Sequence, residues 1–166
     1  MEEKVKEKQE ISIDELKEKY NEFKQRYGLP EFSEMNKIFD IEDTDVETEF
    51  FLRKIRRVVS DRISGYLRFV EVILNPSNAP MFIFKLIKKL GEDDKKQLTE
   101  IYDVLGKLEI EIIALDLDYD ENREVEFIKK TYEVLNNNIS KKLLLIVKKM
   151  GNGGEEKKDD KGSYFG

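Results

Sequence analysis

The sequence predicts an all-α protein, a bundle of five to six long amphipathic helices with a disordered C-terminal tail. Two observations lead to this prediction. Apolar residues recur three and four positions apart along most of the chain, which is the spacing of one helix face. Charged residues make up 40% of the sequence and fill the positions between them, as in helices with one solvated face. The chain divides into a charged N-terminal arm (1–12), a helical bundle domain (13–150) and a flexible charged tail with terminal aromatic residues (151–166).

The first helix is predicted over residues 13–27. Ser12 and Glu15 form a capping box at its start, where their side chains can bind unpaired backbone amides. The charged arm before it can extend this helix. Gly28 follows its last residue and is a typical helix stop. Ser33 can cap a short turn that runs through Met35, Ile38 and Phe39.

The third helix is the longest, from a cap at Thr44 or Asp45 to Asn75. Gly65 lies within it and costs stability relative to Ala, so we expect another helix to cross closely at that point. The helix also offers enough apolar surface to pair with a second chain. A homodimer is therefore an expected assembly.

The segment 81–90 is apolar over more than half of its circumference, and its three lysines share one narrow arc. We expect this helix to lie buried in the centre of the bundle. The alternative is that Met81 and Phe84 are exposed and form a binding site for a protein partner.

The fifth helix starts at Asp93 and keeps a regular three-four spacing of apolar residues, which is typical of an antiparallel or coiled-coil seam. Residues 109–117 also alternate apolar and acidic side chains, so a strand is the alternative for that segment. The last helix is predicted over 120–150. Three asparagines at 136–138 are expected to kink or interrupt it.

Composition argues against the commonest enzyme sites. The chain has no His and no Cys, so it lacks the side chain that titrates near neutral pH and the thiolate nucleophile. It contains no glycine-rich phosphate loop, no G-x-S-x-G and no H-E-x-x-H motif. We expect no catalytic residue and no cofactor. A carboxylate-dependent enzyme or metal binder is the third functional alternative.

Charge and hydropathy bear on location and source. The net charge of −6 is the difference between 30 basic and 36 acidic residues, which describes a surface of mixed sign. No run reaches the roughly 18 apolar residues of a membrane span, and the first residues lack the apolar run of a signal peptide. We expect a cytoplasmic protein without membrane association.

The abundance of Lys, Glu and Ile resembles the composition of proteins from thermophiles, although a low-GC genome gives a similar bias.

Arg53, Arg56 and Arg57 belong to the densest basic run of the chain. Such a run can bind phosphate groups, so a nucleic-acid or ribonucleoprotein accessory subunit is the second functional alternative. Pairing with Glu49 and Asp61, one helical turn away, explains part of the run.

Asp116, Asp118 and Asp120 have the spacing that opens a calcium-binding loop. The rest of the loop does not fit, because Glu121 occupies the sixth position, where the sharp turn needs Gly. We therefore expect no metal. The acidic loop instead places negative charge at the start of the last helix, where the helix dipole favours it.

Tyr164, Phe165 and Gly166 follow a polar, glycine-rich tether. Aromatic residues presented in this way are typical of short motifs that bind a partner's pocket. The three residues are similar to the hydrophobic-tyrosine-any tails with which proteasome-activating proteins dock between subunits of the core particle. That resemblance implies a terminal carboxylate bound by a basic side chain, with Phe165 lacking the phenolic hydrogen bond of the usual Tyr. The alternative is an inert tail. The predicted function is a noncatalytic protein-protein interaction or adaptor module.

Overall fold

The structure, a computed structural model, describes residues 2–44, 46 and 49–151. Every regular element in these ranges is helical, so the all-α prediction is confirmed. Residues 109–117, for which a strand was the alternative, lie within a helix. In the described ranges, no helix has the length and apolar character needed to cross a membrane.

The helices are α1 (Glu2–Tyr27), α2 (Phe32–Phe39), α3 (Phe51–Leu74), α4 (Met81–Ile87), α5 (Glu92–Leu117), α6 (Glu121–Val134) and α7 (Ser140–Gly151). Short 3-10 turns at Ile41–Asp43 and Pro76–Asn78 link α2 to α3 and α3 to α4. A π-helical turn, Leu135–Ile139, joins α6 to α7 and contains the three asparagines. The interruption predicted there is present as a widened helical turn.

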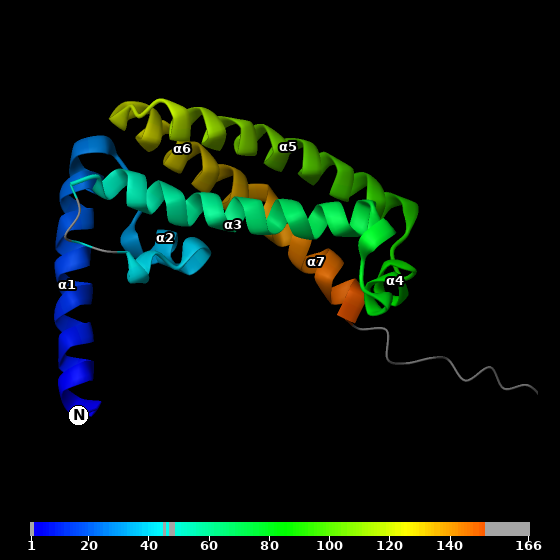
Figure 1. Ribbon diagram of the computed structural model, residues 1–166, viewed down its shortest axis with the longest axis horizontal. Coiled ribbons are helices and arrows are strands. Elements are labelled where there is room, and N and C mark those ends of the chain that lie inside the picture. The colour runs from blue at the N-terminus through cyan, green and yellow to red at the C-terminus, as the bar shows by residue number, and fades with distance from the viewer. Residues whose placement is uncertain (1, 45, 47–48, 152–166) are drawn as a thin grey trace, which may run out of the picture.

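The centre of the fold is α3, which packs along α5 and along α6 (Figure 1). Its inward side chains are fully buried, among them Ile55, Val59 and Ile63. The helix α1 lies across one end of this bundle. Phe23 of α1 contacts Phe51 at the start of α3, with 5.2 Å between ring centroids. At the other end of the bundle, α4 lies beside the last turns of α7.

Two helices do not begin at their predicted caps, and for α1 this is the extension through the charged arm that the sequence allowed. The helix α1 begins at Glu2 and passes through Ser12 without a break, because residues 2–11 are mostly strong helix formers and contain neither Gly nor Pro. The helix α3 begins at Phe51. Thr44 is buried at the end of the preceding 3-10 turn and does not cap α3, and Asp45 lies outside the described residues.

The starts of α5 and α6 lie within one residue of their predicted positions. Asp94 accepts a hydrogen bond from the Gly91 amide at 3.0 Å and so caps the start of α5. Hydrogen bonds from Lys149 and from the Gly91 amide lower the pKa of Asp94 below its usual value. Asp120 caps α6 by accepting from the Arg123 amide at 2.8 Å. Both caps are carboxylates at a helix start, where the dipole stabilises them.

The expectation that another helix crosses closely at Gly65 is wrong. Gly65 is exposed, and a Cβ atom built there meets nothing within 4 Å. Replacing Gly65 with Ala is therefore expected to raise the free energy of unfolding by about 0.5–1 kcal/mol, because Ala restricts the unfolded chain and suits a helix interior. Urea unfolding followed by circular dichroism measures the change. A loss of stability would contradict the open space found around Gly65.

Candidate functional site

A buried ion cluster links α3 to α5 and α6. Arg56 of α3 and Glu124 of α6 are only 1% and 0% exposed. The Arg56 Nε donates to Glu124 Oε2 at 2.8 Å, and its Nη2 donates to Asp116 Oδ1 at 2.6 Å. Burial acts to lower the pKa of Arg56, but the hydrogen bonds to Glu124 and Asp116 outweigh it and raise that pKa above its usual value. Arg56 is therefore a permanent cation that holds three helices together.

Arg53 and Arg57 complete the basic run predicted to bind phosphate. Arg53 lies over the ring of Tyr119, with 4.9 Å from its guanidinium carbon to the ring centroid, and its Nε is 3.9 Å from Glu124 Oε1. Arg57 is exposed. The structure thus brings Arg53 and Arg56 together at Glu124, whereas Arg57 lies on the surface apart from them.

Asp116 near the end of α5 and Asp118 and Asp120 in the loop after it have different partners. Asp116 pairs with Arg56, Asp118 pairs with Arg123 at 3.3 Å, and Asp120 caps α6. Within residues 2–44, 46 and 49–151, no group of three or more acidic side chains is placed to hold a metal ion.

The helix α4 carries an exposed apolar surface made of Met81, Phe82 and Phe84. These side chains are 79%, 61% and 37% exposed, and no residue of α4 is buried. The prediction that this segment lies buried in the bundle centre is wrong, because α3, α5 and α6 already fill that centre. The α4 surface corresponds to the alternative, in which Met81 and Phe84 face solvent. Phe82 is a further exposed residue that sequence reasoning did not single out.

A second apolar surface runs along α5, which the sequence analysis also missed. Ile110, Ile113 and Leu117 are 67%, 50% and 83% exposed. Together with Gly106 they form a row at spacings of four, three and four, which we call the outer stripe. The buried residues of α5, from Leu98 to Leu115, recur at the same spacings of three and four on the opposite side of the helix. The signal was the alternation in 109–117, which on a helix gives two apolar sides.

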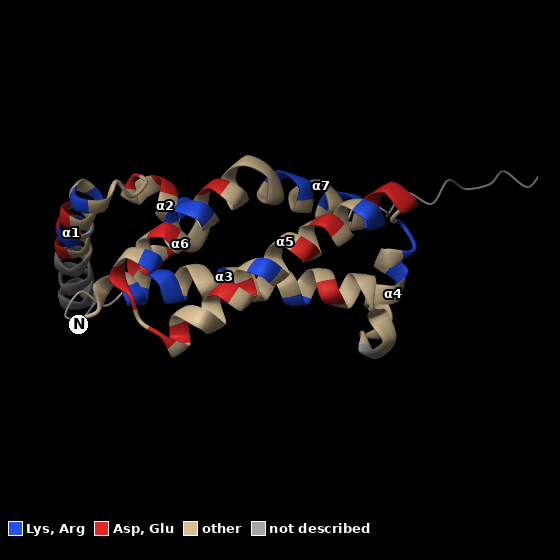
Figure 2. Cartoon of the chain, turned by 90° about the horizontal axis from the view of Figure 1, so that it is seen from above, with Lys and Arg blue, Asp and Glu red and all other residues tan. Residues whose placement is uncertain are grey.

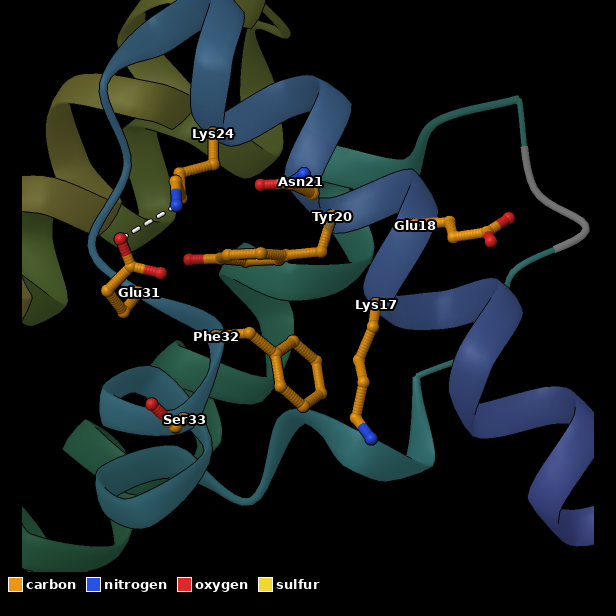
Figure 3. A pocket seen from close by; sticks show the side chains of 8 residues that line it. All are labelled: Lys17, Glu18, Tyr20, Asn21, Lys24, Glu31, Phe32 and Ser33. Carbon is orange, nitrogen blue, oxygen red and sulfur yellow. Dashed lines mark hydrogen bonds and ion pairs between the residues drawn. The ribbon is translucent and has the colours of Figure 1, made fainter.

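Two surface grooves flank α2, and a tyrosine hydroxyl in each of them is hydrogen-bonded. The groove between α1 and α2 has a volume of about 440 Å³ and is shown in Figure 3. The Tyr20 hydroxyl at its floor donates to the Pro30 carbonyl at 2.9 Å, and Lys24 pairs with Glu31 at its rim. Burial, with a smaller effect of Glu31, raises the pKa of Tyr20 above its usual value. These contacts fix α2 against α1.

The second groove, of about 490 Å³, lies between α2, α3 and the junction of α6 with α7. Tyr132 donates to Glu34 Oε2 at 2.9 Å and accepts from Asn136 at 3.3 Å. Burial and the hydrogen bond to Glu34 raise the pKa of Tyr132. Tyr132 therefore stays a neutral donor that ties α6 to α2.

The tail residues Tyr164, Phe165 and Gly166 lie outside the described residues. In the described part, Figure 2 shows Lys and Arg interspersed with Asp and Glu along the helices, in agreement with the mixed surface expected from composition. The chain matches no protein-family model, no curated protein and no solved structure. The surfaces themselves are therefore the basis for a functional proposal.

Proposed function

We propose that this protein is a noncatalytic interaction module that binds an acidic partner protein through the α4 surface. The observation that supports the proposal is the exposure of Met81, Phe82 and Phe84 on a helix with no buried residue. Single exposed apolar side chains are ordinary, but three within four residues form a patch. Met and aromatic residues are also enriched at protein interfaces.

The charges around the patch favour an acidic partner. Lys85 of this helix and Lys88, the residue that follows its end, are both exposed. Lys89 extends to the end of α7, where it donates to the Met150 carbonyl at 2.8 Å. An apolar centre with a basic rim suits a partner whose apolar contact is surrounded by carboxylates.

The tail is a second predicted contact. Residues Tyr164 and Phe165 remain the proposed docking motif of this module, on the sequence grounds given above. The nucleic-acid alternative has less support, because Arg53 and Arg56 both approach Glu124.

A photo-crosslinking residue placed at Phe82 tests the α4 surface. In a lysate of the source organism we expect a discrete crosslinked protein, which is absent when the same residue is placed at Asn137, an exposed position far along the chain. The double variant Met81→Ser, Phe82→Ser should lose this partner while its melting curve stays close to that of the wild type, because exposed changes cost within about 0.5 kcal/mol.

A matched variant separates α4 from the tail. Ala at both Tyr164 and Phe165 should reduce recovery of the same partner if the tail contributes to binding. Equal crosslinking from Phe82 and Asn137, or full binding by the α4 double variant, would refute the α4 surface as the binding site. Loss of binding in the tail variant alone would assign the contact to the tail.

A further inference from the structure

The outer stripe of α5 has no partner in the described chain. In Figure 1, α5 lies along the upper side of the bundle, and no described helix covers it from above. Gly106 is part of this stripe, and a Cβ atom built there meets nothing within 4 Å. Packing within the chain thus gives no reason for Gly in the middle of a 26-residue helix, where it costs about 0.5–1 kcal/mol relative to Ala.

We propose that two copies of the chain pair through the outer stripes of their α5 helices, antiparallel and around a two-fold axis. A two-fold axis near the midpoint of Ile110 and Ile113 places each of these residues opposite the other in the second copy. The same register places Leu117 opposite Gly106 of the second copy. The large side chain of Leu117 then packs against Gly106, which has no side chain, so the two helices can approach closely.

Charge selects the antiparallel orientation. Lys107 lies beside the stripe, is exposed and makes no ion pair with a described residue. The opposite end of the stripe carries Asp118, the residue after α5, whose side chain pairs with Arg123 and is still 82% exposed. An antiparallel pair brings Lys107 near Asp118 of the second copy, whereas a parallel pair would place the two acidic ends together. Charges flanking an interface mainly fix its orientation in this way.

The size of the stripe indicates a reversible dimer. From Gly106 to Leu117 it spans twelve residues, so its two ends are eleven helical rises of 1.5 Å, or about 16 Å, apart. Interfaces below about 1,200 Å² are typical of weak, transient complexes. The long α3, which the sequence suggested as the dimer surface, uses its apolar side against α5 and α6 within the chain.

Sedimentation equilibrium tests the pairing. The wild-type chain should show a monomer-dimer equilibrium, and Ile113→Glu should raise its dissociation constant at least tenfold, because a charge would be buried at the two-fold axis. Leu145→Glu is the matched control. Leu145 is 60% exposed on α7, outside the stripe, and its replacement should leave the equilibrium unchanged. A wild-type monomer at every concentration, or equal effects of both variants, would overturn the proposal.

Single-cysteine variants test the orientation, since the chain has no Cys of its own. In the antiparallel register the two copies of residue 113 are offset by only about 4–5 Å along the helix axes, so the Ile113→Cys chain should form a disulfide-linked dimer on oxidation. The two copies of residue 117 are about 16 Å apart along the axes, beyond the reach of a disulfide. Efficient dimers of the Leu117→Cys chain would show parallel pairing and overturn the antiparallel arrangement.

The variant Gly106→Leu adds a further test, because it should affect the stability of the monomer and the affinity of the dimer in opposite directions. The monomer should be as stable as the wild type or more stable, because a Cβ atom at this position meets nothing within 4 Å and Leu is a better helix former than Gly. The dimer should weaken at least tenfold, because the close approach at Leu117 is blocked. Gly65→Ala, on α3, should leave the dimer unchanged. An undiminished dimer in Gly106→Leu would show that this glycine does not face a second copy.

Discussion

Replacing Arg56 with Met is expected to lower the free energy of unfolding by about 3–5 kcal/mol, because it leaves the fully buried carboxylate of Glu124 without its close cation. Arg53 does not substitute, since its Nε is 3.9 Å from Glu124 Oε1 and that oxygen has no hydrogen-bond partner among the described residues. Urea denaturation at neutral pH, compared with the wild type, measures the loss.

Two further variants separate this mechanism from a simple packing defect. In the double variant Arg56→Met, Glu124→Leu both charges are gone, and we expect stability near that of the wild type, because apolar replacement of a whole buried pair is often neutral. Asp116→Asn should cost only about 0–1 kcal/mol, since Asp116 is 49% exposed and water can replace its contact. A double variant as unstable as Arg56→Met alone would contradict the unpaired-charge explanation.

The second large effect is expected in the core of α5. Leu105 is fully buried against the rest of the bundle, so Leu105→Ala should lower the free energy of unfolding by about 2–5 kcal/mol through lost burial and the cavity left behind. Ile110→Ala, on the outer stripe at 67% exposure, should change it within about 0.5 kcal/mol in dilute solution. Thermal unfolding at low protein concentration compares the two. Similar losses of stability in the two variants would contradict the placement of Leu105 on the buried side of α5 and Ile110 on its exposed side.

Helical periodicity was sufficient to predict the fold class and to place the starts of α5 and α6 within one residue, because both depend on residues close together in sequence. The place of α4 in the fold could not be predicted in this way. Its apolar composition fits burial as well as exposure, and the outcome depends on whether other helices already fill the core. Gly65 shows the same limit, because an exposed glycine and a glycine at a crossing look alike in one sequence.

The candidate site was predicted in part. Exposure of Met81 and Phe84 was one of two alternatives considered, whereas the outer stripe was missed. The alternation in 109–117 was interpreted as a choice between strand and helix, although on a helix it specifies two apolar sides. The sequence could not show which arginine of the run is buried, because the carboxylate that pairs with Arg56, Glu124, lies 68 residues later in the chain.

The π-helical turn between α6 and α7 sets the phase of the C-terminal third of the core. Buried residues occur at four-residue intervals three times in succession, at Thr131, Leu135, Ile139 and Leu143. In a regular α-helix with 3.6 residues per turn, each such step would rotate the row by about 40°. The wider turn absorbs this rotation. Loss of a single asparagine at 136–138 would therefore leave the buried row in phase, because the wide turn can close into a regular α-helical turn. Eleven residues instead of twelve would then separate Thr131 from Leu143, and a regular helix turns over eleven residues by only about 20° more than three full turns, so Ile146 and Met150 would keep their direction toward the core.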